Sequence, residues 1–213
     1  MNETLPQPCF DLIETIAFDP EEGLIDLEAH VARIGASASA LGFRFDRHAA
    51  RNELHAATFR LTGSACVRMR LSRSGALAIE SRAAPVSPDA VTVALRPLPV
   101  APDDPRLRHK TSDRRFYDDA RRQAGTFEVL FVHPSGLITE GSFTSLFVAR
   151  EDGMLVTPAL SLGLLPGVLR GRLICEGEAV EGELRPGDLA NGFLIGNALR
   201  GLIPARLADD ATG

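Results

Sequence analysis

The 213-residue sequence is poor in several residue types: it has no tryptophan, one tyrosine, three cysteines and a single lysine. No basic stripe is interleaved with aromatic side chains, so nucleic-acid binding receives no support. The cysteines are Cys9, Cys66 and Cys175, and they form no CxxC pair and no Cys/His ligand spacing. We therefore predict reduced thiols, with neither a disulfide framework nor a bound metal.

Long apolar runs are also missing. No run approaches the roughly 20 residues that cross a bilayer, and residues 1–10 lack the basic and apolar regions of a signal peptide. We therefore expect a cytoplasmic protein without membrane contact. The composition, 45% apolar and 24% charged residues with a net charge of −5, is typical of a globular protein with one large or two small domains.

Hydrophobic periodicity predicts an α+β (mixed α/β) fold, beginning with a domain over residues 1–84. Gly42 is suited to end the first helix of this domain, and Asp46 to cap the second. We expect Leu54, Ala57 and the segment from Phe59 to Leu61 on the buried side of that second helix. The predicted strands are 10–18, 24–26, 67–71 and 77–81, and the predicted helices are 27–41 and 47–60.

Pro85-Val86-Ser87-Pro88 interrupts the pattern and predicts a linker over 85–89, followed by a second domain over 90–213. Residues 97–108 are rich in proline and aspartate and predict a loop. The other elements predicted in this domain are strands at 91–95, 128–133, 136–140, 144–149, 154–157 and 193–195, and helices at 114–124 and 169–177.

Lys110 is the most informative single residue, because every other basic side chain in the sequence is arginine or histidine. Arginine cannot replace a lysine that forms a Schiff base, since its guanidinium group stays protonated. A lysine amine becomes nucleophilic when burial or nearby cations lower its pKa, and Arg108, Arg114 and Arg115 are available as such cations. The alternative is that Lys110 is an ordinary solvated charge.

Glu140 and Arg33 are candidates for binding polar groups. Glu140 follows an apolar strand and precedes Gly141, so it is either a solvated cap or a carboxylate that faces a ring nitrogen. Arg33 shares a helix face with His30. An arginine on a buried face needs an anionic partner, which is either a phosphate or a structural carboxylate.

Two glycine-containing turns are candidate anion sites. Leu165-Pro166-Gly167-Val168 opens a helix, whose free N–H groups suit a phosphate. Asn197-Ala198-Leu199-Arg200-Gly201 is a similar turn after a strand, and it lacks the GxGxxG pattern of a dinucleotide site. Each turn is also consistent with an ordinary junction between elements.

Taken in order, these segments resemble the fold-type IV pyridoxal-phosphate family, also called class IV aminotransferases, from Phe10 to Leu207. The resemblance implies a small N-terminal α/β domain, a C-terminal mixed pseudo-barrel domain and pyridoxal 5′-phosphate between them, usually in a homodimer. It rests on Glu14-Thr15, His30-Val31-Ala32-Arg33, His109-Lys110-Thr111-Ser112-Asp113-Arg114, Gly136-Leu137-Ile138-Thr139-Glu140-Gly141, Leu165-Pro166-Gly167-Val168 and Asn197-Ala198-Leu199-Arg200-Gly201.

The resemblance implies roles for the candidate residues. Lys110 is the catalytic residue and holds the cofactor as a Schiff base. Glu140 pairs with the pyridine nitrogen, and Arg33 binds the phosphate. Leu165 packs against one face of the ring.

The remaining implied contacts involve backbone groups and substrate. The phosphate site is completed by the N–H groups of Val168 and Leu169 and by the Asn197-Ala198 turn. Arg114 and Arg200 are candidates for binding the carboxylates of a small amine substrate.

The flanking residues favour one branch of the family. Branched-chain aminotransferases usually carry an Asn-Tyr pair after the lysine, where this chain has Ser112-Asp113-Arg114-Arg115, and an asparagine at the position of Ser145. Residues 110–118 are more similar to 4-amino-4-deoxychorismate lyases, which release 4-aminobenzoate and pyruvate in folate biosynthesis. An aminotransferase for branched-chain or D-amino acids is the alternative, and a cofactor-free binding protein on the same scaffold is a third hypothesis.

Overall fold

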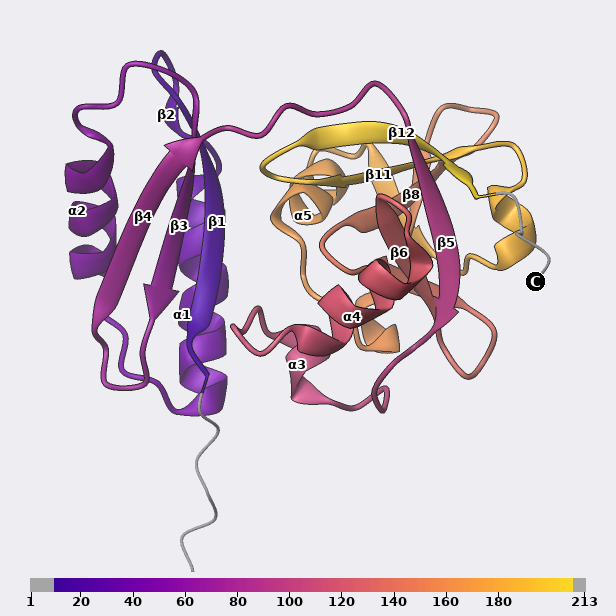
Figure 1. The fold of residues 1–213 in the computed structure, drawn as a ribbon, viewed down its shortest axis with the longest axis horizontal. Coiled ribbons are helices and arrows are strands. Elements are labelled where there is room, and N and C mark those ends of the chain that lie inside the picture. Colours follow the sequence, from indigo (N-terminus) through magenta and orange to yellow (C-terminus); the bar gives the residue numbers. More distant parts are fainter. Residues whose placement is uncertain (1–9, 209–213) are drawn as a thin grey trace, which may run out of the picture.

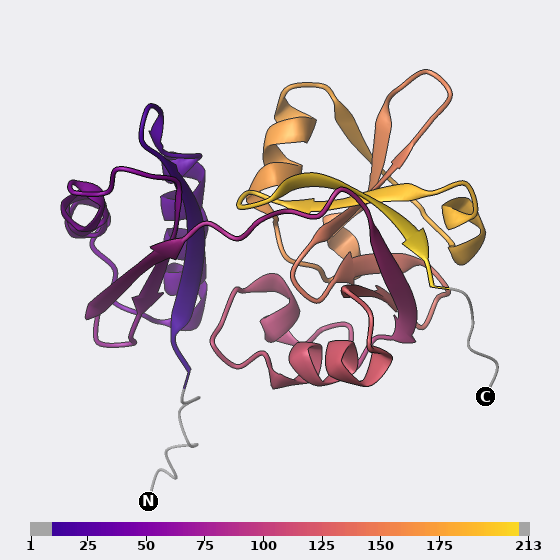
Figure 2. The same cartoon turned by 45° about the horizontal axis from the view of Figure 1, so that its top comes forward.

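The computed structural model describes residues 10–208, which form two β-sheets joined by one stretch of chain (Figures 1 and 2). The four-stranded sheet has the order β2-β1-β3-β4, and the eight-stranded sheet has the order β10-β9-β8-β11-β12-β5-β6-β7. Helices and strands alternate much as predicted, which confirms the mixed α/β fold class. Cys9 and most of the segment examined for a signal peptide lie outside the described residues.

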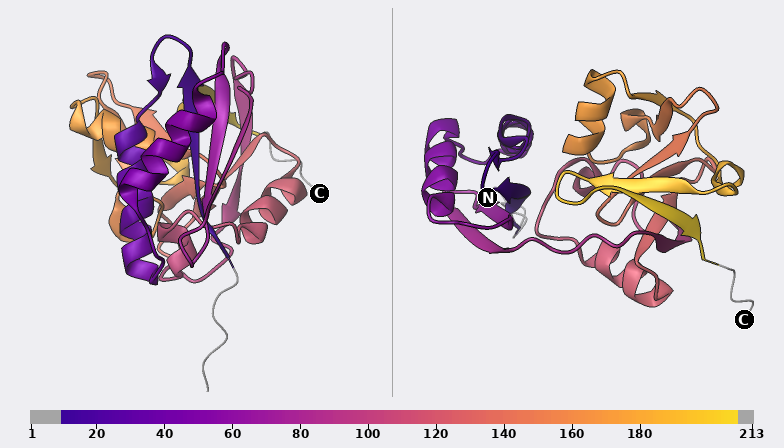
Figure 3. Two further views of the ribbon diagram at one scale, coloured as in Figure 1. Left: turned by 90° about the vertical axis from the view of Figure 1, so that its left-hand side faces the viewer. Right: turned by 90° about the horizontal axis from the view of Figure 1, so that it is seen from above.

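The four-stranded sheet is antiparallel, and both of its helices cover the same face (Figure 3). Alternate residues of its central strand, including Leu12 and Ile16, pack on that face against Val31 and Ile34. Its elements are β1 (Leu12–Asp19), β2 (Gly23–Leu24), α1 (Leu27–Leu41), α2 (Arg47–Thr58), β3 (Ala65–Leu71) and β4 (Leu77–Ala83).

The predicted cap of α2 is confirmed, whereas its predicted buried side is partly wrong. Asp46 accepts hydrogen bonds from the N–H groups of His48 and Ala49, at 2.9 and 3.0 Å. Ala57 is exposed and Phe59 is 87% exposed. The helix ends at Thr58, so Phe59 lies beyond the face that packs on the sheet.

The eight-stranded sheet contains the remaining strands and is mixed, with parallel pairing of β9 with β10, β12 with β5 and β5 with β6. Its strands are β5 (Val91–Pro97), β6 (Glu128–Val132), β7 (Ile138–Gly141), β8 (Ser145–Ala149), β9 (Leu155–Pro158), β10 (Ala179–Gly182), β11 (Phe193–Asn197) and β12 (Gly201–Leu207). Its helices are α3 (Pro105–Arg108), α4 (Arg115–Ala124), the 3-10 helix η1 (Leu160–Leu162), α5 (Val168–Cys175) and the 3-10 helix η2 (Pro186–Leu189).

The eight-stranded sheet curls on itself. Strand β7 lies at one edge and β8 lies third from the other, yet only residues 142–144 connect them. The Gly141 N–H donates to the Thr144 carbonyl at 2.8 Å across this connection. The curl therefore brings the end of β7, with Glu140, next to the start of β8.

Strands β10 and β12, and helix α3, were not predicted from the sequence. Pro204 interrupts the β pattern of β12, and only Ile203 and Ala205 are buried there. Pairing with β5 begins at Ala205, so Pro204 lies outside the part of β12 that is paired on both sides. Helix α3 occupies four residues of the predicted 97–108 loop.

The chain from Ala84 to Ala90 forms neither helix nor strand, and it connects β4 to β5. The division into domains 1–84 and 90–213 with a linker at 85–89 stays a prediction. Within residues 10–208, no helix combines the length and the apolar character needed to cross a bilayer. No group of His, Cys, Asp or Glu suited to a metal ion occurs in the same residues.

A substitution at Gly196 tests how closely β11 packs against β12 and α5. A Cβ atom at Gly196 would lie 2.5 Å from the Gly201 carbonyl oxygen and 2.9 Å from Leu169 Cδ2. We expect Gly196→Ala to lower the free energy of unfolding by about 1–3 kcal/mol, measured in urea. The matched control is Gly171→Ala on the exposed face of α5, where nothing lies within 4 Å of the added atom. That variant should gain about 0.5–1 kcal/mol, and equal losses in both would contradict the packing argument.

Candidate active site

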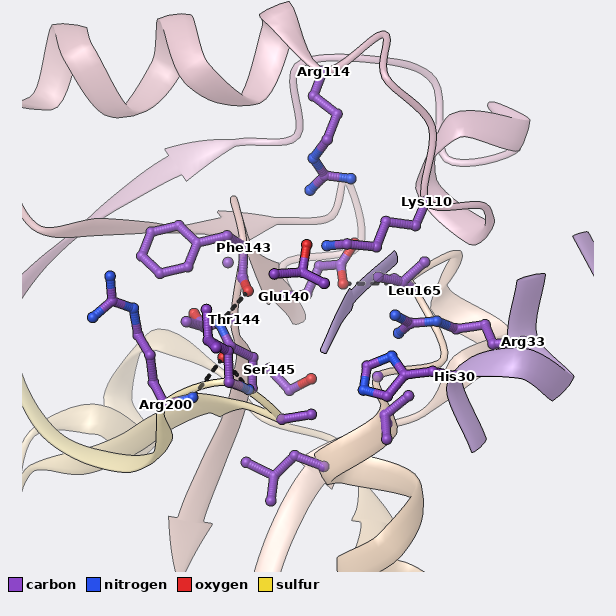
Figure 4. A pocket seen from close by; sticks show the side chains of 18 of the residues that line it. His30, Arg33, Lys110, Arg114, Glu140, Phe143, Thr144, Ser145, Leu165 and Arg200 are labelled. Carbon is purple, nitrogen blue, oxygen red and sulfur yellow. Dashed lines mark hydrogen bonds between the residues drawn. The ribbon is translucent and has the colours of Figure 1, made fainter. Parts of the chain in front are cut away.

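A cavity of about 240 Å³ lies between the two sheets, a size that suits a small organic molecule (Figure 4). Its walls come from β1, α1 and β4 in the first half of the chain, and from helices, strand ends and loops in the second half. All ten residues predicted to form a site line it: Arg33, Lys110, Arg114, Glu140, Leu165, Val168, Leu169, Asn197, Ala198 and Arg200.

Backbone pairing with β1 fixes the position of Lys110. The Lys110 carbonyl accepts the Ile13 N–H at 2.8 Å, and the Ser112 N–H donates to the Asp11 carbonyl at 2.8 Å. Thr111 forms an isolated antiparallel bridge with Leu12. Residues 110–112 thus extend the free edge of β1, and the lysine side chain projects from that edge into the cavity.

The Lys110 amine is partly buried and does not behave as a solvated surface charge. Burial, followed by the positive charges of Arg114 and Arg33, lowers its pKa to about 7, although Glu14 and Glu140 oppose the shift. Of the three flanking arginines considered from the sequence, only Arg114 contributes to the lowered pKa of Lys110. Arg108 and Arg115 are exposed. Near neutral pH, this amine can therefore accept a proton or attack a carbonyl carbon.

Glu140 is 6% exposed, so it is not a solvated cap. Its Oε1 accepts the Tyr117 hydroxyl at 2.9 Å, and its Oε2 accepts the Leu165 N–H at 3.1 Å. Burial raises the pKa of Glu140 to about 7, while these two donors and the Arg114 and Lys110 charges oppose the shift. The carboxyl group can therefore hold or release a proton near neutral pH.

The anionic partner of Arg33 is a structural carboxylate, Glu14, which is 1% exposed. Arg33 donates to it through Nε at 2.9 Å and Nη2 at 2.5 Å, and His30 Nδ1 lies 2.7 Å from Glu14 Oε2. Burial would raise the pKa of Glu14, but Arg33 and the His30 hydrogen bond outweigh it and lower the pKa to about 2. Arg33 Nη1 also donates to the Pro166 carbonyl at 3.1 Å.

His30 is left with one unsatisfied nitrogen at the cavity. The residue is 1% exposed, and its Nε2 has no hydrogen-bond partner among the described residues. A buried polar atom without a partner is uncommon in folded proteins. His30 is one of the residues that line the cavity, so a polar ligand bound there can supply the missing partner.

The two predicted anion turns lie on the same cavity. Gly167 is the N-cap of α5, so the N–H groups of Val168 and Leu169 are the first of the helix and have no partner within it. Asn197 Oδ1 accepts the N–H groups of Leu199 and Arg200, at 3.0 and 3.1 Å. The Asn197 side chain therefore holds the turn in shape, rather than reaching into the cavity.

Besides Arg33, four arginines line the cavity: Arg82, Arg114, Arg121 and Arg200. Arg114 Nη2 donates to the Ser142 carbonyl at 2.6 Å, and Arg200 Nη1 donates to the Val86 carbonyl at 3.1 Å. Among the described residues, only Arg121 of these four has a carboxylate within 4 Å, Asp118 at 3.5 Å. The cavity is therefore strongly attractive to carboxylates.

Sequence reasoning missed the partners that orient the predicted residues. Glu14 was noted only as part of a resemblance, and Tyr117 was given no role. One signal for Glu14 was available, because it occupies the same face of β1 as Leu12 and Ile16. A carboxylate on a core-facing position needs a buried cation.

Comparison with known proteins gives a consistent set of relatives. A family model described as amino-transferase class IV matches residues 11–208. A Schizosaccharomyces pombe protein, provisionally named an aminodeoxychorismate lyase, is 29% identical over 203 residues, covering 89% of this chain and 86% of that protein. A Mesorhizobium loti crystal structure, provisionally titled an amino-acid aminotransferase, is 35% identical with a TM-score of 0.87, covering 93% of this chain and 100% of that one.

A more distant structure has the same fold. It is the PLP-bound form of a hypothetical aminotransferase from Mycobacterium tuberculosis, and it is 19% identical with a TM-score of 0.80. The match covers 92% of this chain and 81% of that one.

The lowered pKa of Lys110 has a direct chemical test in protein without bound ligand. We expect its reaction rate with trinitrobenzenesulfonate to rise as the pH increases through about 7, because the neutral amine is the reactive form. Lys110→Arg gives the background from the α-amino group. Arg114→Gln should move the midpoint upward, since it removes a neighbouring cation. A midpoint at the ordinary lysine value would contradict the burial argument.

Proposed function

Because this chain belongs to the class IV amino-transferase family, we propose that it is a pyridoxal 5′-phosphate enzyme with Lys110 as its catalytic residue. The Lys110 amine is suited to bond covalently to an aldehyde, because burial and two arginines lower its pKa to about 7. This amine is the observation that carries the proposal, since the chain has no second lysine.

The residues around the cavity fit this cofactor. A phosphate group requires cations and N–H donors, and the unsatisfied His30 Nε2 lies on the same wall as Arg33. A pyridine nitrogen requires a carboxyl partner, and Glu140 has one further acceptor position on each oxygen. We assign the phosphate to Arg33, Val168, Leu169 and the Asn197-Ala198 turn, the ring nitrogen to Glu140, and one ring face to Leu165.

When bound, the cofactor supplies an electron sink for the carbon atom that carries the substrate amine. Lys110 then acts as the general base that removes the proton from that carbon, for which a pKa of about 7 is suitable. Glu140, fixed by Tyr117 and Leu165, keeps a proton at the ring nitrogen. The curled sheet and α1 limit the access of water to these groups.

The reaction we propose is the conversion of 4-amino-4-deoxychorismate to 4-aminobenzoate and pyruvate. The arginines of the cavity support it, because this substrate carries two carboxylates, whereas a branched-chain amino acid carries one. Arg114 and Arg200 are the proposed carboxylate-binding residues. In this reaction the proton next to the amine is lost, and pyruvate leaves from the neighbouring carbon. The two products together contain all the atoms of the substrate, so neither water nor an oxidant is needed. The name of the Schizosaccharomyces pombe relative supports the same reaction.

An aminotransferase acting on branched-chain or D-amino acids is the second candidate. It is favoured by the Mesorhizobium loti structure, which is 35% identical and covers the same elements. Lys110 and Glu140 would serve such a reaction equally well, because both reactions begin with the same proton removal. A homodimer, a place in folate biosynthesis and a cytoplasmic location are further proposals from the family resemblance.

The proposed reaction is tested with purified protein loaded with pyridoxal phosphate. We expect equal amounts of 4-aminobenzoate and pyruvate from 4-amino-4-deoxychorismate. Lys110→Arg should abolish both products and the visible absorbance of the bound cofactor, because a guanidinium group does not bond to an aldehyde. If the enzyme instead forms a keto acid from amino acids and no 4-aminobenzoate, the lyase proposal is wrong and the aminotransferase proposal is supported. Visible absorbance unchanged in Lys110→Arg would refute the role of Lys110.

A further inference from the structure

Glu128, the first residue of β6, is a completely buried carboxylate with an unusual set of partners. Its Oε1 accepts the N–H groups of Val129 and Ser142, both at 2.9 Å, and the Ser142 hydroxyl at 2.5 Å. Its Oε2 accepts the Phe143 N–H at 3.0 Å and the Thr144 hydroxyl at 2.9 Å. All five partners are donors, and four of them belong to the turn formed by residues 142–144.

The carboxylate orients this turn. In a trans peptide the N–H and C=O groups point in opposite directions, so a turn whose N–H groups face Glu128 directs its carbonyls away from it. The Phe143 N–H and the Ser142 carbonyl belong to one peptide unit. That carbonyl accepts the Arg114 guanidinium at 2.6 Å, and the Phe143 carbonyl accepts Asn197 Nδ2 at 3.1 Å.

The turn is closed tightly around Glu128. A Cβ atom at Gly141 would lie 2.7 Å from Glu128 Oε2 and 2.5 Å from Thr144 Oγ1. Arg114, at the far end of the connection, also lies over the Tyr117 ring, with its Cζ atom 4.5 Å from the ring centroid. A buried carboxylate is costly to keep in a core, and an apolar side chain would fill the same space at lower cost.

We propose that Glu128 is a positioning residue: through the Ser142–Phe143 peptide, it holds the Arg114 guanidinium where a substrate carboxylate binds. The positioning of Arg114 is independent of the proposed function, whereas the role of Arg114 toward substrate rests on it. Glu128 itself faces the turn and has no place on the cavity wall.

The isosteric variant Glu128→Gln should remove one specific contact, the hydrogen bond that the Phe143 N–H donates to the carboxylate. Its single carbonyl oxygen is best placed on the Oε1 side, where two backbone N–H groups require an acceptor. Its NH₂ group then faces the Thr144 hydroxyl, which can rotate to accept, and the Phe143 N–H, which cannot. The Ser142–Phe143 peptide therefore loses its anchor, and Arg114 loses the carbonyl that holds it.

The first measurement is the rate at which phenylglyoxal modifies Arg114 in the holoenzyme, followed by mass spectrometry. We expect Glu128→Gln to increase this rate about tenfold, the effect of losing one hydrogen bond to a charged group. Leu54→Ala, in the core of the four-stranded sheet, is the control for general destabilisation and should leave the rate unchanged. An equal increase in Leu54→Ala would overturn the proposal.

A conservative variant separates hydrogen bonding from packing. Glu128→Asp keeps two acceptor oxygens but removes a methylene, so it should recover part of the Arg114 protection that Glu128→Gln loses. If Glu128 only fills space, Glu128→Gln is harmless and Glu128→Asp is the damaging variant. That order of effects would refute the positioning role. Where one of the two variants folds poorly, the other still decides alone, because space filling predicts a harmless Glu128→Gln and a damaging Glu128→Asp.

Kinetics then test the link to substrate. We expect Glu128→Gln to raise KM for 4-amino-4-deoxychorismate about tenfold with a smaller change in kcat, measured at saturating pyridoxal phosphate. In the Arg114→Gln background, Glu128→Gln should have little further effect on KM, because the arginine that Glu128 positions is already absent. Increased modification of Arg114 with an unchanged KM would keep the positioning role and reject Arg114 as a substrate residue. Absence of product from the unmodified enzyme would instead reject the proposed reaction.

Discussion

The backbone pairing between β1 and residues 110–112 determines where the site forms. The Lys110 carbonyl accepts the Ile13 N–H, and the next residue along β1 is Glu14, which binds Arg33. One strand therefore fixes both the reactive amine and the arginine opposite it. Because the lysine belongs to the second half of the chain and β1 to the first, the cavity depends on the pairing of β1 with residues 110–112.

Three buried carboxylates around the site show how their partners set their charge. Burial opposes the charge of Glu14, but the Arg33 guanidinium and the His30 hydrogen bond lower its pKa to about 2, so it is a permanent anion paired with Arg33. Glu140 has one hydroxyl and one N–H donor, and burial raises its pKa to about 7. Burial also raises the pKa of Glu128, but its five donors favour the ionised form. The same residue type thus serves as a counter-ion, as an exchangeable proton site and as an anchor for a turn.

Sequence patterns predicted what depends on neighbours along the chain. Helix 27–41 and the Asp46 cap follow from spacing within a few residues, and both are confirmed. Strand β12 was missed because its stability comes from pairing with β11 and β5, despite Pro204. Glu128 was missed for the same reason, since its partners lie 14 to 16 residues away. A carboxylate inside the apolar run Phe127 to Val132 was the available signal, although it does not name the partner.

The cavity has two sides, and they differ in what a sequence can reveal. The side formed by Arg33, Lys110, Glu140 and the start of α5 is the one to which we assign the cofactor, and its residues lie in the short motifs that carry the family resemblance. The other side is formed by Arg82, Arg114, Arg121 and Arg200, and it is where we propose that substrate carboxylates bind. Its arginines come from β4, α4 and two separate turns, and their positions depend on carbonyls such as that of Ser142. The chemistry of the cofactor is therefore readable from short motifs, whereas the choice of reaction depends on long-range contacts that only the folded chain brings together.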